Sequence, residues 1–187
     1  QNGFSVRCFI VDLGQPDEES LDAVKARMLA CGAEGAEVVP GQAALAEAGL
    51  KVIQAQARYE GGYWNTTGIA RPVTVAAILP ELNRRGAGVL FHGATGRGND
   101  QVRFDLGVAS LAPHLRIIAP AREWDMSREE EIEFAKQRGI PIPVTRVSPY
   151  SVDENLWGRS IEAGVLEDPW VEPPEEVYTW TRSISKT

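Results

Sequence analysis

The sequence predicts an α/β domain built around a largely parallel sheet. Short apolar, β-rich runs alternate along the chain with stretches whose apolar residues recur at helical spacing. Glycine or proline follows most of these segments and marks the connections between them. One strand-like run also passes through a glycine-rich turn directly into a helical pattern. Strands that alternate with helices in this way are typical of parallel sheets with crossover helices.

The expected strands are short and rich in apolar and β-branched residues. They cover residues 5–11, 36–39, 88–91 and 116–119. The first of them ends in the turn-forming sequence D-L-G-Q-P, and the third precedes the glycine-rich turn.

Five helices are expected between and after these strands. One begins near Pro72, because proline is tolerated in a first turn, and Pro80 inside the same pattern predicts a kink or an early end. Ser127 to Glu130 match a capping box, and Gly139 supplies a helix stop. The other three cover residues 18–31, residues 42 to about 57, and a stretch that begins near residue 99.

The character of the sequence changes after Pro141, where proline, tryptophan and acidic residues dominate. We therefore expect an α/β domain at residues 1–143 and a loop-rich, ordered arm at residues 144–187. The arm contains seven large apolar or aromatic residues that we expect to be buried, namely Tyr150, Leu156, Trp157, Ile161, Trp170, Tyr178 and Trp180.

The composition argues against several classes of protein. The net charge of −7 and pI of about 5.0 disfavour a nucleic-acid-binding or polybasic membrane-binding protein. No apolar run approaches the roughly 18 residues of a membrane span, and the start does not resemble a signal peptide. Two cysteines form neither a disulfide framework nor a metal-binding spacing. We expect a cytoplasmic protein with no nucleic-acid or membrane partner and no metal site.

The stretch from His92 to Asp100, H-G-A-T-G-R-G-N-D, is the strongest candidate for a binding site. Its glycines permit close approach of a ligand to the backbone, and the following helix directs free N–H groups into the turn. The spacing matches neither a P-loop nor a Rossmann motif. A tight strand–helix connection without a ligand is the alternative, but the many polar residues nearby favour a ligand.

Three further groups of polar residues are candidates with structural alternatives. Arg103 lies on the same helical face as Asn99 and can grip a carboxylate, or it is a solvated surface arginine. Thr66 or Thr67 either caps a helix or contributes to a site. In the segment Y-S-V-D-E-N-L-W-G-R-S-I-E, a turn and a cap explain about half of the polar residues.

Taken together, these segments resemble the argininosuccinate synthase family over nearly the whole chain. The glycine-rich string and the Y-S-V-D-E-N segment, in this order and spacing, are its most specific matches. The matching strings lie at residues 12–15, 68–72, 92–104, 110–113, 118–120, 139–143, 150–164 and 166–170. The resemblance implies a partial nucleotide-binding domain of the adenine nucleotide alpha hydrolase-like, ATP-pyrophosphatase type at residues 1–143, and an arm that leads to a second domain.

The resemblance also implies a reaction and a set of site residues. Family members ligate citrulline to aspartate: the ureido oxygen attacks the α-phosphorus of ATP, pyrophosphate leaves, and the aspartate amine then displaces AMP. ATP would enter with Mg²⁺, in a homotetramer. Citrulline would be held by Tyr63, Asn99, Arg103, Ser151, Ser160 and Glu162. Aspartate would be held by Thr67, Thr95, Asn99 and Asp100. ATP would contact Val11, Gly93, Thr95 and Asp153. No catalytic residue is singled out.

The sequence also departs from the family pattern. It contains no S-G-G-x-D-T-S pyrophosphate-binding string, so we expect a fragment or a truncated form. Gly68, Arg97 and Ala121 stand where serine, lysine and tryptophan are usual. A non-catalytic paralogue that binds amino acids but lost the ATP loop is therefore an alternative. A transfer-RNA-modifying adenylating enzyme is a third, disfavoured by the acidic pI.

Overall fold

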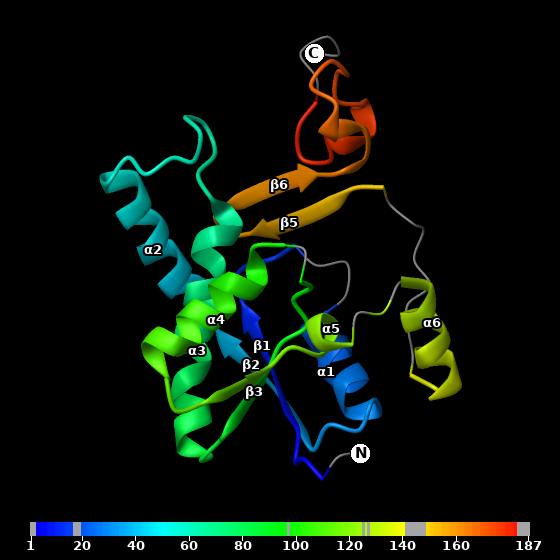
Figure 1. Cartoon of the computed structure of the whole chain (residues 1–187). Helices are drawn as coiled ribbons and strands as arrows, with labels where there is room; N and C mark the ends of the chain where they lie inside the picture. Colours follow the sequence, from blue (N-terminus) through cyan, green and yellow to red (C-terminus); the bar gives the residue numbers. More distant parts are fainter. Residues whose placement is uncertain are drawn as a thin grey trace.

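In the computed structural model of the chain, the described residues are 3–16, 20–96, 98–124, 126, 128–140 and 149–182 (Figure 1). Strands and helices alternate as the sequence predicts. The strands are β1 (Arg7–Asp12), β2 (Gly35–Pro40), β3 (Val89–Phe91), β4 (Arg116–Ile118), β5 (Ser151–Asn155) and β6 (Gly158–Glu162). The helices are α1 (Leu21–Ala30), α2 (Gln42–Gln54), α3 (Thr66–Arg84), α4 (Asp100–Leu111), α5 (Pro120–Glu123) and α6 (Arg128–Gln137).

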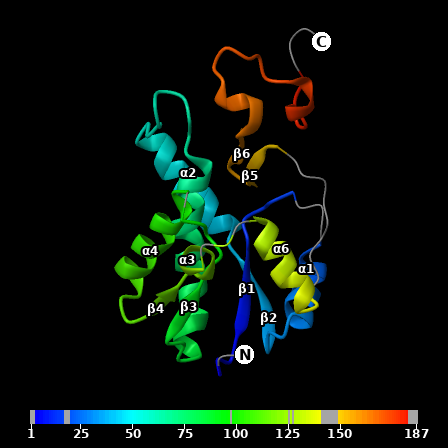
Figure 2. The ribbon, with the colours of Figure 1, turned by 45° about the vertical axis from the view of Figure 1, so that its right-hand side comes forward.

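The four strands of the α/β part form two separate parallel pairs. β1 pairs with β2, from Arg7 opposite Gly35 to Asp12 opposite Pro40, and β3 pairs with β4. Figure 2 shows the two pairs side by side with their strands running in a similar direction. A groove of about 570 Å³ lies between residues 4–9, which include the start of β1, and residues 86–91, which include all of β3. The parallel strands are confirmed, but β1 and β3 share no ladder in the described chain.

Helix α3 is the central helix of the molecule. One core cluster joins Val75 and Leu82 of α3 to Leu90 of β3 and Val108 of α4. A second cluster joins Ala70 of α3 to the end of β1 and to α2. Because α3 contributes to both clusters, it fixes the two strand pairs and α4 relative to one another.

The predicted start of α3 is wrong, and the helix does not end early at Pro80, which was one of the two alternatives for that residue. The helix begins at Thr66, six residues before Pro72, and it continues through Pro80 to Arg84. A proline inside a helix removes one backbone hydrogen bond. Here fully buried Val75 and nearly buried Leu82 hold the helix on both sides of Pro80. Tertiary packing therefore overrides the local preference.

The arm is more regular than expected, because it contains an antiparallel hairpin, β5–β6, and two short 3₁₀ helices at Gly164–Glu167 and Glu175–Val177. The hairpin docks through Trp157, whose ring packs so closely on α2 that a Cβ at Gly49 would lie 2.3 Å from it. The expected burial of the arm's large apolar and aromatic residues is wrong for Trp170, which is 94% exposed, and for Leu156, Tyr178 and Trp180, which are also exposed. The capping-box prediction at Ser127 falls outside the described residues.

Candidate functional site

The polar residues predicted in the arm lie on one face of the β5–β6 hairpin. Ser151 is opposite Glu162, and Asp153 is opposite Ser160. Because side chains alternate along a strand and pair across it, these four residues share a face. Asn155 continues that face, is buried, and donates from Nδ2 to the Thr66 carbonyl at 3.3 Å. The face is thereby anchored over the first turn of α3.

The first turn of α3 carries a small hydroxyl cluster beneath the hairpin. The Tyr63 hydroxyl lies 2.9 Å from Thr66 Oγ1 and accepts from the Thr67 N–H at 3.4 Å. Burial raises the pKa of Tyr63, but hydrogen bonds with Thr66, Thr67 and Ser160 outweigh it and leave the pKa below its ordinary value. Neither threonine is the cap, which is Asn65 in a left-handed conformation without a side-chain hydrogen bond. The capping interpretation of this segment is therefore wrong.

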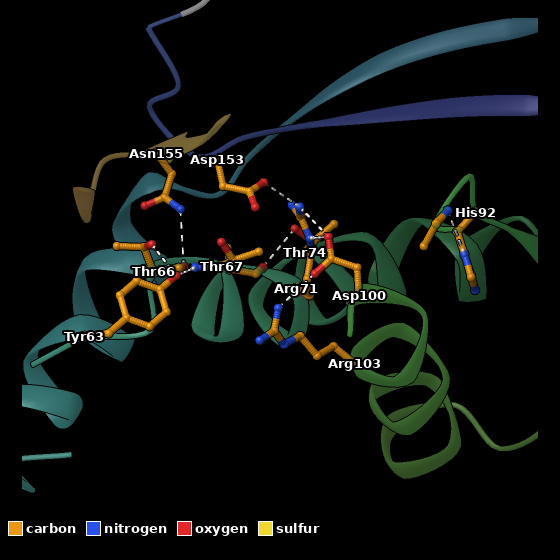
Figure 3. A network of polar contacts seen from close by, with 12 residues as sticks. Tyr63, Thr66, Thr67, Arg71, Thr74, His92, Asp100, Arg103, Asp153 and Asn155 are labelled. Atoms are coloured by element: carbon orange, nitrogen blue, oxygen red, sulfur yellow. Dashed lines mark hydrogen bonds and ion pairs between the residues drawn. The ribbon is translucent and has the colours of Figure 1, made fainter. Parts of the chain in front are cut away.

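Arg71 links the hairpin to α4. Its Nε donates to Asp100 Oδ2 at 2.9 Å, and its Nη2 lies 2.7 Å from the same oxygen. Nη2 also donates to Asp153 Oδ1 at 3.2 Å, and Arg103 Nη1 donates to Asp100 Oδ1 at 3.0 Å. Figure 3 shows Arg71 between the two aspartates, with Arg103 below Asp100. Two cations and two anions from three elements thus form one network.

This network is partly open to solvent and balanced in charge. The side chains of Arg71, Asp100, Arg103 and Asp153 are between a quarter and about a third exposed. Burial raises the pKa of Asp100, but the hydrogen bonds and charges of Arg71 and Arg103 outweigh it and hold the pKa below its ordinary value. Such a network can exchange its internal ion pairs for the carboxylate and ammonium groups of a zwitterionic ligand.

The glycine-rich loop between β3 and α4 has glycines that the fold itself does not require. Gly93, Gly96 and Gly98 all lack the positive φ that favours glycine. A Cβ at Gly93 or Gly98 would meet no atom within 4 Å. The backbone conformation of the loop therefore does not require glycine at these positions. Glycine there still permits close approach of a ligand to the backbone.

The structure brings together only part of the predicted site. Tyr63, Thr67 and Ser160 form one contact group, and Asp100, Arg103 and Asp153 form another through Arg71. The side chains of the remaining predicted residues form no hydrogen bond or ion pair with either group among the described residues; they are Val11, Gly93, Thr95, Asn99, Ser151 and Glu162. Val11 was expected to contact the nucleotide through its backbone, and its carbonyl accepts from Gln15 Nε2 at 3.2 Å.

Two residues of this site were missed at the level of the sequence. Arg71 lies in the G-I-A-R-P string and Asn155 in the Y-S-V-D-E-N string. Both strings carry the family resemblance, but no role was predicted for either residue. Arg71 lies four residues after Thr67, and residues at this spacing share a helical face, which is a usable signal. Nothing local identifies Asn155, because its partner Thr66 is 89 residues away.

Of the three departures from the family pattern, two lie in the described structure. A Cβ at Gly68 would lie 2.2 Å from Asn65 Oδ1, so the Asn65 side chain occupies the space that a larger residue would need. Ala121 borders an apolar hollow of about 410 Å³, together with Gly93, Trp124 and Phe134. Of the predicted site residues, only Gly93 lines this hollow. Arg97 lies outside the described residues.

The described residues contain no group of three or more His, Cys, Asp or Glu side chains that could hold a metal ion. Within the same ranges, no helix combines the length and apolar composition needed to cross a membrane.

Comparison with known proteins connects the whole chain to one family. Residues 1–141 match the model of the "Arginosuccinate synthase N-terminal HUP domain", and residues 150–187 match the model of the C-terminal domain of the same family. The chain is 46% identical over 186 residues to the argininosuccinate synthase of Dehalococcoides mccartyi, covering 99% of this chain and 45% of the relative. It is 51% identical to that of Dictyoglomus thermophilum over 173 residues, which cover 92% of this chain and 43% of the relative. It is 50% identical to that of a Synechococcus species over 184 residues, 98% of this chain and 45% of the relative. The chain thus spans just under half the length of these relatives.

Proposed function

The chain belongs to the argininosuccinate synthase family, and from this we propose that it forms the substrate-binding part of an ATP-dependent ligase that joins citrulline to aspartate and releases AMP and pyrophosphate. The observation that carries the proposal is the network of Arg71, Asp100, Arg103 and Asp153 beside the glycine-rich loop. Both amino-acid substrates carry a carboxylate and an ammonium group, so their site needs paired charges of both signs.

The glycine-rich loop supports nucleotide binding next to this network. At Gly93 a Cβ would meet no atom within 4 Å, and the backbone conformation does not require glycine. The loop also leads into the N-terminus of α4, whose free N–H groups favour an anion. Mg²⁺ would arrive with ATP as part of the substrate.

Within this site the residues of the chain would act by binding and orientation. Arg103 would exchange its bond to Asp100 for the citrulline carboxylate, which leaves Asp100 able to accept from the aspartate ammonium group. Thr95 and Asn99, whose side chains have no partner among the described residues, would supply neutral hydrogen bonds to substrate. Tyr63, Thr67, Ser151, Ser160 and Glu162 would complete the amino-acid sites, and Val11 and Asp153 the nucleotide site. Positioning of the reacting groups would then supply most of the rate enhancement.

The test measures citrulline binding and citrulline-dependent AMP release in a protein of the relatives' length that carries these residues. Arg103→Ala should weaken citrulline binding by about 10-fold or more, because a charge-assisted carboxylate contact is lost. Circular dichroism should show that the Arg103→Ala variant remains folded. Arg84→Ala, which removes another helical arginine paired with an acidic neighbour, is the matched control and should bind normally.

Three outcomes would contradict parts of this proposal. Loss of folded protein in Arg103→Ala would assign Arg103 a structural role. Amino-acid binding without AMP release would favour the non-catalytic paralogue. Absence of both amino-acid binding and AMP release would remove the enzyme assignment.

We also propose a cytoplasmic location and a homotetramer. Cell fractionation tests the location, and sedimentation analysis tests the oligomeric state.

A further inference from the structure

The glycine-rich loop is held at two points, Ala94 and Gly96, by side chains outside the network described above. At its start, His92 Nδ1 accepts a hydrogen bond from the Ala94 N–H at 3.3 Å. Farther along, Gln101 Nε2 donates to the Gly96 carbonyl at 2.8 Å. The backbone N–H groups of Gly93 and Thr95 have no partner among the described residues. The restrained groups thus alternate with groups that are available to a ligand.

Asp105 of α4 joins the two restraints. His92 Nε2 lies 3.3 Å from Asp105 Oδ1, and Arg122 Nη1 donates to Asp105 Oδ2 at 2.8 Å. The same nitrogen of Arg122 lies 3.2 Å from Gln101 Oε1. A nitrogen that accepts a hydrogen bond carries no proton, so the neutral His92 ring holds its proton on Nε2 and donates it to Asp105.

The His92 ring is well placed to transmit this restraint. Its side chain is 6% exposed, and it stacks on Phe104 with ring centroids 5.1 Å apart and planes at 19°. Its backbone N–H also donates to the Ile118 carbonyl at 3.2 Å, which extends the β3–β4 pairing by one residue. The hydrogen bond from Arg122 holds the pKa of Asp105 below its ordinary value against the effect of burial, and His92 contributes. Asp105 is therefore an anion that fixes the ring between two strands and a helix.

We propose that Asp105, acting through His92, is a positioning residue for the glycine-rich loop. It keeps the Ala94 N–H turned into the protein, so that the backbone at Gly93 and Thr95 faces the ligand. The hydrogen bonds of the Asp105 side chain go to His92 and Arg122 and not to residues 93–96. The part that concerns ligand affinity rests on the proposed function, whereas the part that concerns loop restraint does not.

The test combines two measurements. Residue-resolved amide exchange is followed in the 187-residue chain without ligand, and a protein of the relatives' length that carries these residues is titrated with a fluorescent ATP analogue. Asp105→Ala should speed exchange at Ala94 about tenfold and weaken binding of the analogue several-fold, since one restraining contact is lost. Glu81→Ala, which removes an acidic partner of Arg84 on α3, is the control and should change neither value.

A pair of His92 variants tests the same restraint without altering Asp105. His92→Phe keeps a ring over Phe104 but removes both hydrogen bonds, so exchange at Ala94 should rise. The side-chain oxygen of His92→Asn can still accept from Ala94, so protection should be largely restored. A role confined to core packing predicts the opposite order, because phenylalanine fills the site better.

Unchanged exchange at Ala94 in Asp105→Ala and His92→Phe would overturn the restraint. Faster exchange with unchanged nucleotide affinity would overturn the positioning role. If the longer protein without substitutions binds no ATP analogue, the proposed function fails, while the exchange data still decide whether Asp105 holds the loop.

Discussion

Individual glycines of this chain occupy their positions for different physical reasons. Gly86, after the end of α3, has φ of +63°, a left-handed conformation that other residues adopt with strain. Gly93 does not adopt such a conformation, and a Cβ there would meet no atom within 4 Å. A substitution at Gly86 should therefore affect folding, whereas one at Gly93 should affect ligands.

This difference predicts opposite effects of two alanine substitutions. Gly93→Ala should leave the urea unfolding free energy nearly unchanged but weaken ATP binding, because the new Cβ occupies space that a ligand approaches. Gly86→Ala should lower the unfolding free energy by about 1 kcal/mol and leave ATP binding intact. Equal nucleotide affinity in Gly93→Ala and the unmodified chain would contradict a nucleotide at this loop.

Asp100 should make the stability of the chain depend on pH. Its pKa in the folded state is lowered from the ordinary value of 3.8, so the folded protein binds the proton less readily than the unfolded chain. The stabilisation is complete well above pH 3.8 and is lost as the pH falls through the folded-state pKa. Asp100→Asn should therefore be less stable than the unmodified chain by about 1 kcal/mol near pH 6. The difference in unfolding free energy should shrink toward pH 3, and a constant difference would contradict the ion-pair network.

Among the helices and strands, α3 and the hairpin show where local patterns mislead. Proline rules predicted a start near Pro72 and a kink or an early end at Pro80, yet α3 begins at Thr66 and continues to Arg84, and buried Val75 and Leu82 lie on either side of Pro80. The alternation along β5 and β6 is polar on the face toward α3, so it does not resemble the usual apolar-inward strand. A polar site, rather than a core, lies beneath this hairpin.

Docking of the hairpin on α2 predicts an unusual cost for a helix-favouring substitution. Gly49→Ala should lower the unfolding free energy by about 1–3 kcal/mol, because the added Cβ collides with the Trp157 ring. Gly107→Ala in α4 is the matched control, since its Cβ would lie 3.2 Å from Val75 Cγ2 and helix propensity offsets the tight contact. Urea unfolding measures both, and equal effects would contradict close packing of Trp157.

At the scale of the whole molecule, a groove lies between the two strand pairs. Phe4 and Phe91 meet edge to face with centroids 5.5 Å apart, and both are about half exposed. β1 and β3 each have one paired neighbour among the described strands. Exposed apolar surface along a sheet edge favours non-specific association.

The groove predicts binding of a hydrophobic dye such as anilinonaphthalene sulfonate by the folded chain. Phe4→Lys should lower dye fluorescence, because it places a charge in the exposed apolar lining. Leu50→Lys, at an exposed apolar position of α2, is the control and should change it little. A similar loss in both variants would show that the dye does not report on the groove.

The order and type of most elements followed from local pattern, because apolar periodicity and turn residues act over a few positions. The glycine-rich loop, Asp100 and Arg103 were recognisable for the same reason, since they lie within twelve consecutive residues. The central role of Arg71, its contact with Asp153 82 residues away, and the anchoring of Asn155 depended on three-dimensional packing. Charge pairing across such separations has no signature in a single sequence, because it arises only when helix α3 brings the hairpin and α4 to the same place.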